Sequence, residues 1–224
     1  MSDPKPTEHK PRTRRPSVAK TTQTRQAIVA AALDVFLERG FSDARMEDVA
    51  ARAGVAKGTV YRYFTDKEAL FEGVLREVIA VPLAHLTLLL PEPGESLRDA
   101  IWRAVLPIVR DMERSKRAPV FRLILAESSR FPALARMFRA LVFDPVADMI
   151  QRLAQRGVET GELTTDALVK FPHLMIAPNM LAVLWNGVLD PEHPLDMEAM
   201  FAAHLDIVFG ISEDTSSTKC HKPL

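Results

Sequence analysis

The stretch RMEDVAARAGVAKGTVYRYFTDKEALF, residues 45–71, decides the fold of this chain. It has the pattern of two short helices joined by a tight turn, followed by the start of a third helix. Gly54 closes the first helix, because glycine adopts the left-handed turn conformation without the steric penalty of a Cβ atom. Met46, Val49 and Ala53 recur at spacings of three and four and share one helical face. The pattern therefore predicts a helix-turn-helix unit.

The second short helix has one apolar side and one side suited to contact with DNA. Ala56, Val60 and Phe64 recur every four residues and are expected to face inward. Gly58 and Arg62 then point almost directly away from that side. A glycine inside a helix costs roughly 1 kcal/mol relative to alanine. Its presence indicates that a partner approaches the backbone at this point, and DNA is a suitable partner.

The third helix begins with a pattern that suits a bound phosphate. Thr65 and Glu68 match the capping box of a helix N-terminus. Lys67 falls in the first turn, where the helix dipole disfavours a cation. A phosphate docked there would reverse this penalty, since helix N-termini bind anions.

The segment VAARAGVAKGTVYRYFTDKEALF resembles the helix-turn-helix signature of the tetracycline-repressor (TetR) family of transcription regulators. The resemblance covers residues 24–75, and the following residues stand at motif spacing: Gly54, Lys57, Gly58, Tyr61, Tyr63, Phe64, Lys67, Glu68, Leu70 and Phe71. Arg62 departs mildly, because the family often has an aromatic or polar residue there. The resemblance implies an N-terminal three-helix DNA-binding domain and a larger C-terminal helical domain for ligand binding and dimerisation.

Eight residues are predicted to meet operator DNA. Phosphate contacts are expected from Arg45, Lys57, Tyr63 and Lys67, and base contacts from Thr59, Tyr61 and Arg62, with Gly58 allowing the backbone to come close. The alternative for Arg45 is a solvated surface side chain.

Composition and charge narrow the class of protein. The chain has 224 residues, and its 47% hydrophobic content supports a hydrophobic core. Its formal net charge is zero, so the overall charge does not indicate nucleic-acid binding. Basic residues do cluster near the N-terminus: Lys5, Lys10, Arg12, Arg14, Arg15, Lys20 and Arg25. Such an arm can enter a minor groove, or it can be a solubilising tail.

Other classes find no support in the sequence. Cys220 is the only cysteine, so the chain has neither a disulfide framework nor zinc-ligand spacing, which fits a reducing cytoplasm. No apolar run reaches the roughly 18 residues of a membrane span, and no secretory signal is apparent. Glycine-rich phosphate loops, nucleophile elbows and metal-ligand clusters are missing as well. We therefore expect a cytoplasmic protein that is not an enzyme and needs no cofactor or metal.

The remaining sequence predicts an all-α fold, since no run has the period-two pattern of a strand. Four segments are expected: a disordered basic arm (1–22), the DNA-binding domain with a linking fourth helix (23–80), the ligand-binding and dimerisation domain (81–211) and a disordered tail (212–224). C-terminal helices are predicted over 97–114, 120–130, 132–157, 165–189 and 196–210. The fourth helix is expected to span 66–79 and to end before Pro82.

Helices 167–189 and 196–210 are more apolar than the surface helices of a monomer need to be. Two such helices can pair with a second copy in a two-fold four-helix interface, or they can be buried within one subunit. Members of the TetR family dimerise through their last two helices, which favours the dimer. A dimer would place two recognition helices about 34 Å apart, the spacing of successive major-groove faces.

An effector pocket in the C-terminal domain is implied by the family. Its predicted lining is Trp102, Phe121, Phe138, Phe143, His173, Met175, Asn179 and Trp185. At helical spacing the same aromatic and methionine residues also fit a plain core. His173 and Asn179 are polar within apolar sequence, and Pro172 and Pro178 free nearby carbonyls, so this cluster is the predicted polar contact. The alternative is a satisfied histidine and amide at an interface.

These observations predict a homodimeric, ligand-responsive transcription regulator. It would be a repressor that binds a palindromic operator and is released by a small, largely apolar effector, with the fourth helix coupling the two domains. The alternative is an effector-independent helix-turn-helix DNA-binding or nucleoid protein, which would have no dry cavity in its C-terminal domain.

Overall fold

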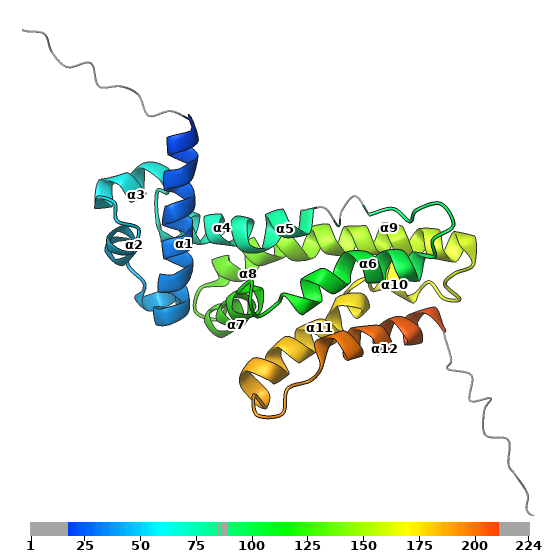
Figure 1. Ribbon diagram of the computed structural model, residues 1–224. Coiled ribbons are helices and arrows are strands. Elements are labelled where there is room, and N and C mark those ends of the chain that lie inside the picture. The colour runs from blue at the N-terminus through cyan, green and yellow to red at the C-terminus, as the bar shows by residue number, and fades with distance from the viewer. Residues whose placement is uncertain (1–17, 85, 87–88, 211–224) are drawn as a thin grey trace, which may run out of the picture.

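The computed structural model describes residues 18–84, 86 and 89–210, and within them every regular element is helical (Figure 1). This confirms the predicted all-α class. The predicted arm falls mostly on residues outside the described part of the chain, but residues 18–22 are already helical. The predicted tail lies outside it entirely.

The N-terminal domain is built on one long helix. Its elements are α1 (Val18–Asp43), α2 (Met46–Arg52), α3 (Lys57–Tyr63) and α4 (Lys67–Leu75). In Figure 1, α2 and α3 lie on one side of α1, and α4 leads away from it toward the rest of the molecule. The predicted turn at Gly54 is confirmed by its φ of +65°, and Gly40 breaks α1 with a φ of +76°.

The fourth helix differs from its prediction at both ends. Its N-cap is Asp66, whose Oδ1 accepts a hydrogen bond from the Ala69 amide at 2.7 Å, so the predicted capping box at Thr65 is wrong. At the other end α4 continues through the π-helical segment η1 (Arg76–Ala80) into α5 (Val81–Leu83). Pro82 does not stop the helix, because it stands in the first turn of α5, where a proline fits.

The C-terminal domain holds the remaining helices. They are α6 (Leu97–Arg110), α7 (Arg117–Glu127), α8 (Pro132–Phe138), η3 (Arg139–Phe143), α9 (Asp144–Thr160), α10 (Ala167–Lys170), α11 (His173–Leu184), η4 (Trp185–Leu189) and α12 (Met197–Phe209). The predicted start at Pro132 is confirmed, and Asp196 caps α12. The helix predicted over 165–189 is in fact split at Phe171, just before Pro172.

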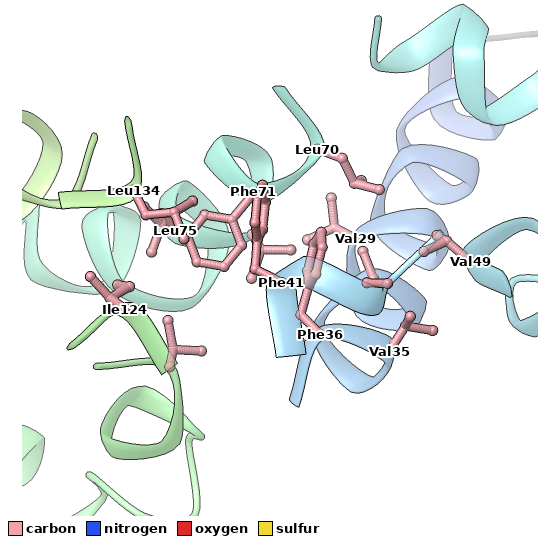
Figure 2. Close-up of a cluster of buried hydrophobic side chains, with 14 of the residues drawn as sticks. Val29, Val35, Phe36, Phe41, Val49, Leu70, Phe71, Leu75, Ile124 and Leu134 are labelled. Atoms are coloured by element: carbon pink, nitrogen blue, oxygen red, sulfur yellow. The ribbon is translucent and has the colours of Figure 1, made fainter. Parts of the chain in front are cut away.

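Two hydrophobic cores hold these helices together. The first contains the N-terminal domain and also reaches into α7, α8 and η3. At its centre Phe71 meets Phe36 and Phe41 edge to face at 5.2 and 5.4 Å between ring centroids (Figure 2). Ile124 and Leu134 approach this cluster from the C-terminal domain (Figure 2). The two domains therefore share one continuous core.

The second core lies between α6, α9, α10, α11 and α12. Trp102 on α6 stacks on Phe201 of α12, with 5.7 Å between ring centroids and an interplanar angle of 8°. Arg110 of α6 pairs with Glu198 of α12 at 2.5 Å. These contacts fix α12 against α6 and leave the other side of α12 uncovered.

Candidate DNA interface and effector cavity

The helix α3 presents a polar, solvent-exposed face beside the turn that precedes it. Lys57, Gly58, Tyr61 and Arg62 are exposed, with Tyr61 at 43%, whereas Val60 is fully buried. Arg45, the residue before α2, is exposed as well. Gly58 and Arg62 are exposed as predicted, but the prediction that Ala56 faces inward is wrong, because Ala56 is the extended N-cap residue before α3 and is exposed. The exposed polar side gives α3 the form of a recognition helix that a major groove can receive.

Gly58 leaves a bare patch on this face. A Cβ atom built at Gly58 would have no neighbouring heavy atom within 4 Å. Its backbone lies in ordinary helix without a positive φ. Neither packing nor backbone conformation therefore requires a glycine here, and the open space is available to a partner.

Lys57 forms an ion pair with an acidic neighbour on the same surface. Its ammonium forms an ion pair with the Glu47 carboxylate of α2 and lies 5.8 Å from the centre of the Tyr61 ring. The hydrogen bond between the two raises the pKa of Lys57 and lowers the pKa of Glu47. Both side chains are exposed, so the pair can open to a phosphate at little cost.

Thr59, Tyr63 and Lys67 are only half exposed. Tyr63 packs against the first core, and the Arg62 guanidinium lies 5.3 Å from the centre of its ring. The Lys67 ammonium donates to the carbonyl oxygens of Phe41 at 2.7 Å and Ser42 at 2.9 Å. Its charge satisfies the end of α1, which explains a lysine in the first turn of α4 without any phosphate.

The same chain segment is held from the C-terminal domain. Glu127, the last residue of α7, accepts hydrogen bonds through Oε1 from the amides of Phe41 at 3.0 Å and Ser42 at 3.4 Å. A Cβ atom at Gly40 would lie 2.7 Å from the same oxygen, so only glycine allows this approach. Residues 41–42 are thus fixed on one side by Lys67 and on the other by Glu127.

The C-terminal domain encloses an apolar cavity of about 160 Å³ between α5, α6, α7, α9, α11 and α12. Its walls are leucine, isoleucine, valine, methionine and phenylalanine side chains, with two polar exceptions, Arg117 and Asn179. An apolar engineered cavity of about 150 Å³ takes up benzene, so this one has room for a small organic molecule.

Five of the eight residues predicted for the effector line this cavity: Phe121, Phe138, Phe143, Met175 and Asn179. The other three do not. Trp102 lies behind Phe201, and Trp185 donates its indole N–H to the His193 carbonyl at 3.1 Å. His173 is exposed beside Phe143, with 6.5 Å between ring centroids. The prediction that His173 forms a polar contact inside the pocket is therefore wrong. His173 is the first residue of α11 and lies on its solvent-exposed side.

Among the lining residues that sequence reasoning missed, Arg117 is the charged one. It opens α7, and its Nε donates to the Val78 carbonyl at 3.3 Å, while its Nη1 is buried without a hydrogen-bond partner. The Asn179 Oδ1 is likewise buried and unpartnered. Nothing in the sequence separates Arg117 from Lys116 beside it, which pairs with Asp34 at 2.6 Å.

An uncharged surface covers α11, η4 and α12. Leu174, Leu181 and Val188 are exposed on the first two, and Ile207 of α12 is 79% exposed. The other exposed positions of α12, Ala199 and Ala203, carry no charge either. In Figure 1, α11 and α12 run side by side along one edge of the molecule. We call these two helices with η4 the α11–α12 face.

The described residues offer neither a metal site nor a membrane-spanning helix. They contain no group of three or more histidine, cysteine, aspartate or glutamate side chains placed to hold a metal ion. Among the same residues no helix has the length and hydropathy to cross a membrane.

An exposed polar helix after a tight turn, carried on a larger helical domain, is the arrangement of a helix-turn-helix transcription regulator. Comparison with known proteins gives the family. Residues 28–74 match the family model described as bacterial regulatory proteins, tetR family, and residues 91–200 match the tetracyclin repressor-like C-terminal domain. Together the two matches cover most of the chain, and the protein belongs to the TetR family of transcription regulators.

Individual relatives agree with this assignment. The chain is 32% identical to the regulator RutR of Escherichia coli K12 over 141 residues, which cover 62% of this chain and 64% of RutR. It thus matches slightly less than two thirds of that relative. A putative TetR-family regulator from Mesorhizobium loti has a similar structure, with a TM-score of 0.67 and 22% sequence identity. The match covers 86% of this chain and 98% of that protein. The flavonoid-responsive regulator FrrA has a TM-score of 0.58 and 27% sequence identity, and the match covers 84% of this chain and 96% of FrrA.

Proposed function

We propose that this protein is a homodimeric repressor that binds a palindromic operator through α3. It leaves the DNA when a small, largely apolar effector enters the C-terminal cavity. The observation that carries the DNA-binding half is the open backbone at Gly58 on an exposed polar helix face. The cavity supports the effector half, since an effector-independent DNA-binding protein would have no use for about 160 Å³ of dry space.

Different residues of the helix-turn-helix would contact the bases and the phosphates of the operator. Tyr61 and Arg62 would reach base edges, with half-buried Thr59 beside them. Arg45 and Lys57 would bind phosphates, Lys57 after leaving Glu47, and Tyr63 would support Arg62 at the edge of the contact. Lys67 would act indirectly by holding residues 41–42.

The dimer would form through the α11–α12 face. An exposed apolar surface on two neighbouring helices is costly in water, and a second copy related by a two-fold axis would bury it. Such a dimer presents two copies of α3 to successive major grooves, which is why a palindromic operator is expected.

The effector would change the spacing of the two recognition helices. The helix from Lys67 to Leu83 begins at the helix-turn-helix unit and ends at the cavity wall, where Ile79 and Leu83 line the space. FrrA is named as a flavonoid-responsive protein, and a small organic effector of that general kind suits the present cavity. A ligand can release DNA only by binding the non-binding arrangement more tightly.

The test is fluorescence anisotropy of the purified protein on DNA from upstream of its own gene, over a salt series. Tyr61→Ala and Arg62→Ala are each expected to weaken specific binding about tenfold or more. Arg136→Ala is the matched control, because Arg136 is an exposed arginine of α8 far from the recognition helix. Equal affinity of wild type for any DNA sequence would contradict the proposal.

A further inference from the structure

Arg117, a half-buried residue at the wall of the apolar cavity, has no acidic partner among the described residues. Among the described residues, the polar lining of this cavity consists of Arg117 and Asn179 and includes no aspartate or glutamate. No acidic side chain among the described residues pairs with Arg117. Taking a charge out of water without a partner costs several kcal/mol, so proteins rarely leave one unpaired.

The neighbours of Arg117 show that an acidic partner could have been provided. Lys116 pairs with Asp34 at 2.6 Å, and Arg122, one turn further along α7, pairs with Glu113 at 2.7 Å. Arg117 instead contributes its Nε to the Val78 carbonyl and leaves Nη1 buried and unpartnered. The guanidinium therefore retains donor capacity toward the cavity.

The acceptor of this bond lies in the helix that links the two domains. Val78 belongs to the π-helical segment η1, and Pro82, four residues later, has no N–H to donate to its carbonyl. Arg117 donates to that carbonyl in a long hydrogen bond of 3.3 Å. The bond is weak by length, and a charged acceptor would outcompete a neutral carbonyl.

From these contacts we infer that the effector is a small carboxylic acid with an apolar body, and that Arg117 and Asn179 bind its carboxylate. This inference rests on the proposed effector function and specifies its ligand. A carboxylate matches a guanidinium in geometry and charge. Asn179 can turn its amide so that Nδ2 donates to the second oxygen. The aromatic and aliphatic walls would hold a single ring or a short alkyl chain.

The same contact gives the ligand a route to the DNA-binding domain. A carboxylate that takes the Arg117 guanidinium removes the donor from Val78, in the π-helical segment of the helix from Lys67 to Leu83. That helix begins next to the recognition helix. Binding at Arg117 would therefore shift the element that both domains share.

The experiment compares matched acids and alcohols by calorimetry on the full chain without DNA. The probes are phenylacetate against 2-phenylethanol, and octanoate against 1-octanol. Wild type should bind at least one acid about tenfold or more tightly than its alcohol. Arg117→Met, which keeps the length and apolar contacts, should reduce this ratio to about one, and Arg117→Lys should give an intermediate ratio.

Arg122→Met is the control, because Arg122 lies on the same helix, is already paired with Glu113 and does not line the cavity. It should keep the acid preference. The inference would be overturned if wild type bound acid and alcohol with equal affinity, or if it bound none of the four probes. A preference for acid that survives Arg117→Met would overturn it as well. Because the ratio compares two ligands on one protein, a stability change in a variant does not mimic the result.

A separate anisotropy series keeps this inference distinct from the proposed function. The preferred acid should release wild type from its operator and leave Arg117→Met bound. Acid preference in a protein that never binds specific DNA would uphold the ligand class and refute the repressor. Specific DNA binding without any acid preference would do the reverse.

Discussion

The recognition surface and the cavity handle charge in opposite ways. On α2 and α3 the charged side chains are exposed and loosely paired, as with Lys57 and Glu47, so partners can be exchanged at low cost. In the cavity a single guanidinium is surrounded by apolar walls and has one buried nitrogen without a partner. The first region suits a large, repetitive polyanion, and the second suits one small molecule with one charge.

The sharpest way to break this comparison is to remove the dimer that links two recognition surfaces. Leu181→Asp together with Ile207→Asp should give a folded monomer, because both side chains are exposed on the α11–α12 face. Operator affinity should fall by about 100-fold or more, since each half-site then binds alone. Sedimentation velocity and anisotropy measure the two effects. Leu125→Asp, at an exposed site of α7, should leave a dimer with normal affinity.

A second prediction separates DNA contact from folding at one residue. Gly58→Leu should reduce operator affinity by about tenfold or more, because the side chain fills the space that the DNA backbone needs. The same change should leave thermal stability equal or slightly higher, since leucine is the better helix former by about 1 kcal/mol. Anisotropy and thermal melting test the two directions. A variant that loses stability and binding together would mean that Gly58 serves the fold.

The partly buried contact between the N-terminal and C-terminal domains should be sensitive to loss of a charge. Glu127→Gln removes the charge from the oxygen that accepts from the Phe41 and Ser42 amides. The loss should be about 1–2 kcal/mol in the free energy of unfolding, because hydrogen bonds to charged groups are worth about 1.5–3 kcal/mol and the amide still accepts weakly. Urea unfolding measures it. Glu159→Gln, at an exposed site near the end of α9, should be silent.

Lys57 and Glu47 provide two substitutions of opposite sign on the recognition surface. Lys57→Ala should weaken operator binding a few-fold and reduce the slope of log affinity against log salt by about 1. Glu47→Gln should strengthen binding by about two- to threefold, because it frees Lys57 and removes a negative charge beside the phosphates. If both substitutions weaken binding alike, their ion pair orders the surface and Lys57 does not meet a phosphate.

The smallest expected effect is a pH dependence at the α11–α12 face. Burial lowers the pKa of His204 below its ordinary value of 6.5, and a hydrogen bond with the backbone of Leu174 opposes this shift. Within α11 the Leu174 carbonyl has no helical donor four residues later, because Pro178 lacks an N–H. The unfolded chain then binds more protons, so stability is full above about pH 6.5 and decreases as the pH falls below it. The melting temperature at pH 5.5 should drop by up to about 2 °C. His204→Gln should abolish this drop, whereas His173→Gln at an exposed site should retain it.

Sequence reasoning succeeded where the physical signal is local. Gly54 ends a helix through its own backbone, Pro132 starts one, and Gly58 and Arg62 of α3 face outward as the helical period predicts. Lys67 shows the limit, because its carbonyl partners lie about 25 residues earlier in the chain. The α4 helix also continued past Ile79, since a proline in the first turn of a following helix does not interrupt it.

The cavity could be predicted only in part for the same reason. Phe121, Phe138 and Met175 were found by residue type, but Trp102 and Trp185 have the same type and lie elsewhere. Arg117 was missed because its unpaired state depends on which side chains are absent around it in three dimensions. An unpaired charge has no signature in a linear pattern.

The core shared by the two domains has a consequence for protein engineering. Side chains of α7, α8 and η3, among them Ile124 and Leu134, complete the packing around Phe41 and Phe71 (Figure 2). The DNA-reading unit is therefore not a portable module that ends at residue 83. A chimera that transplants it onto another sensor must carry residues 118–142, which include Glu127, or supply equivalents. An exchange of the helix-turn-helix unit alone would leave its core without the side chains that complete it.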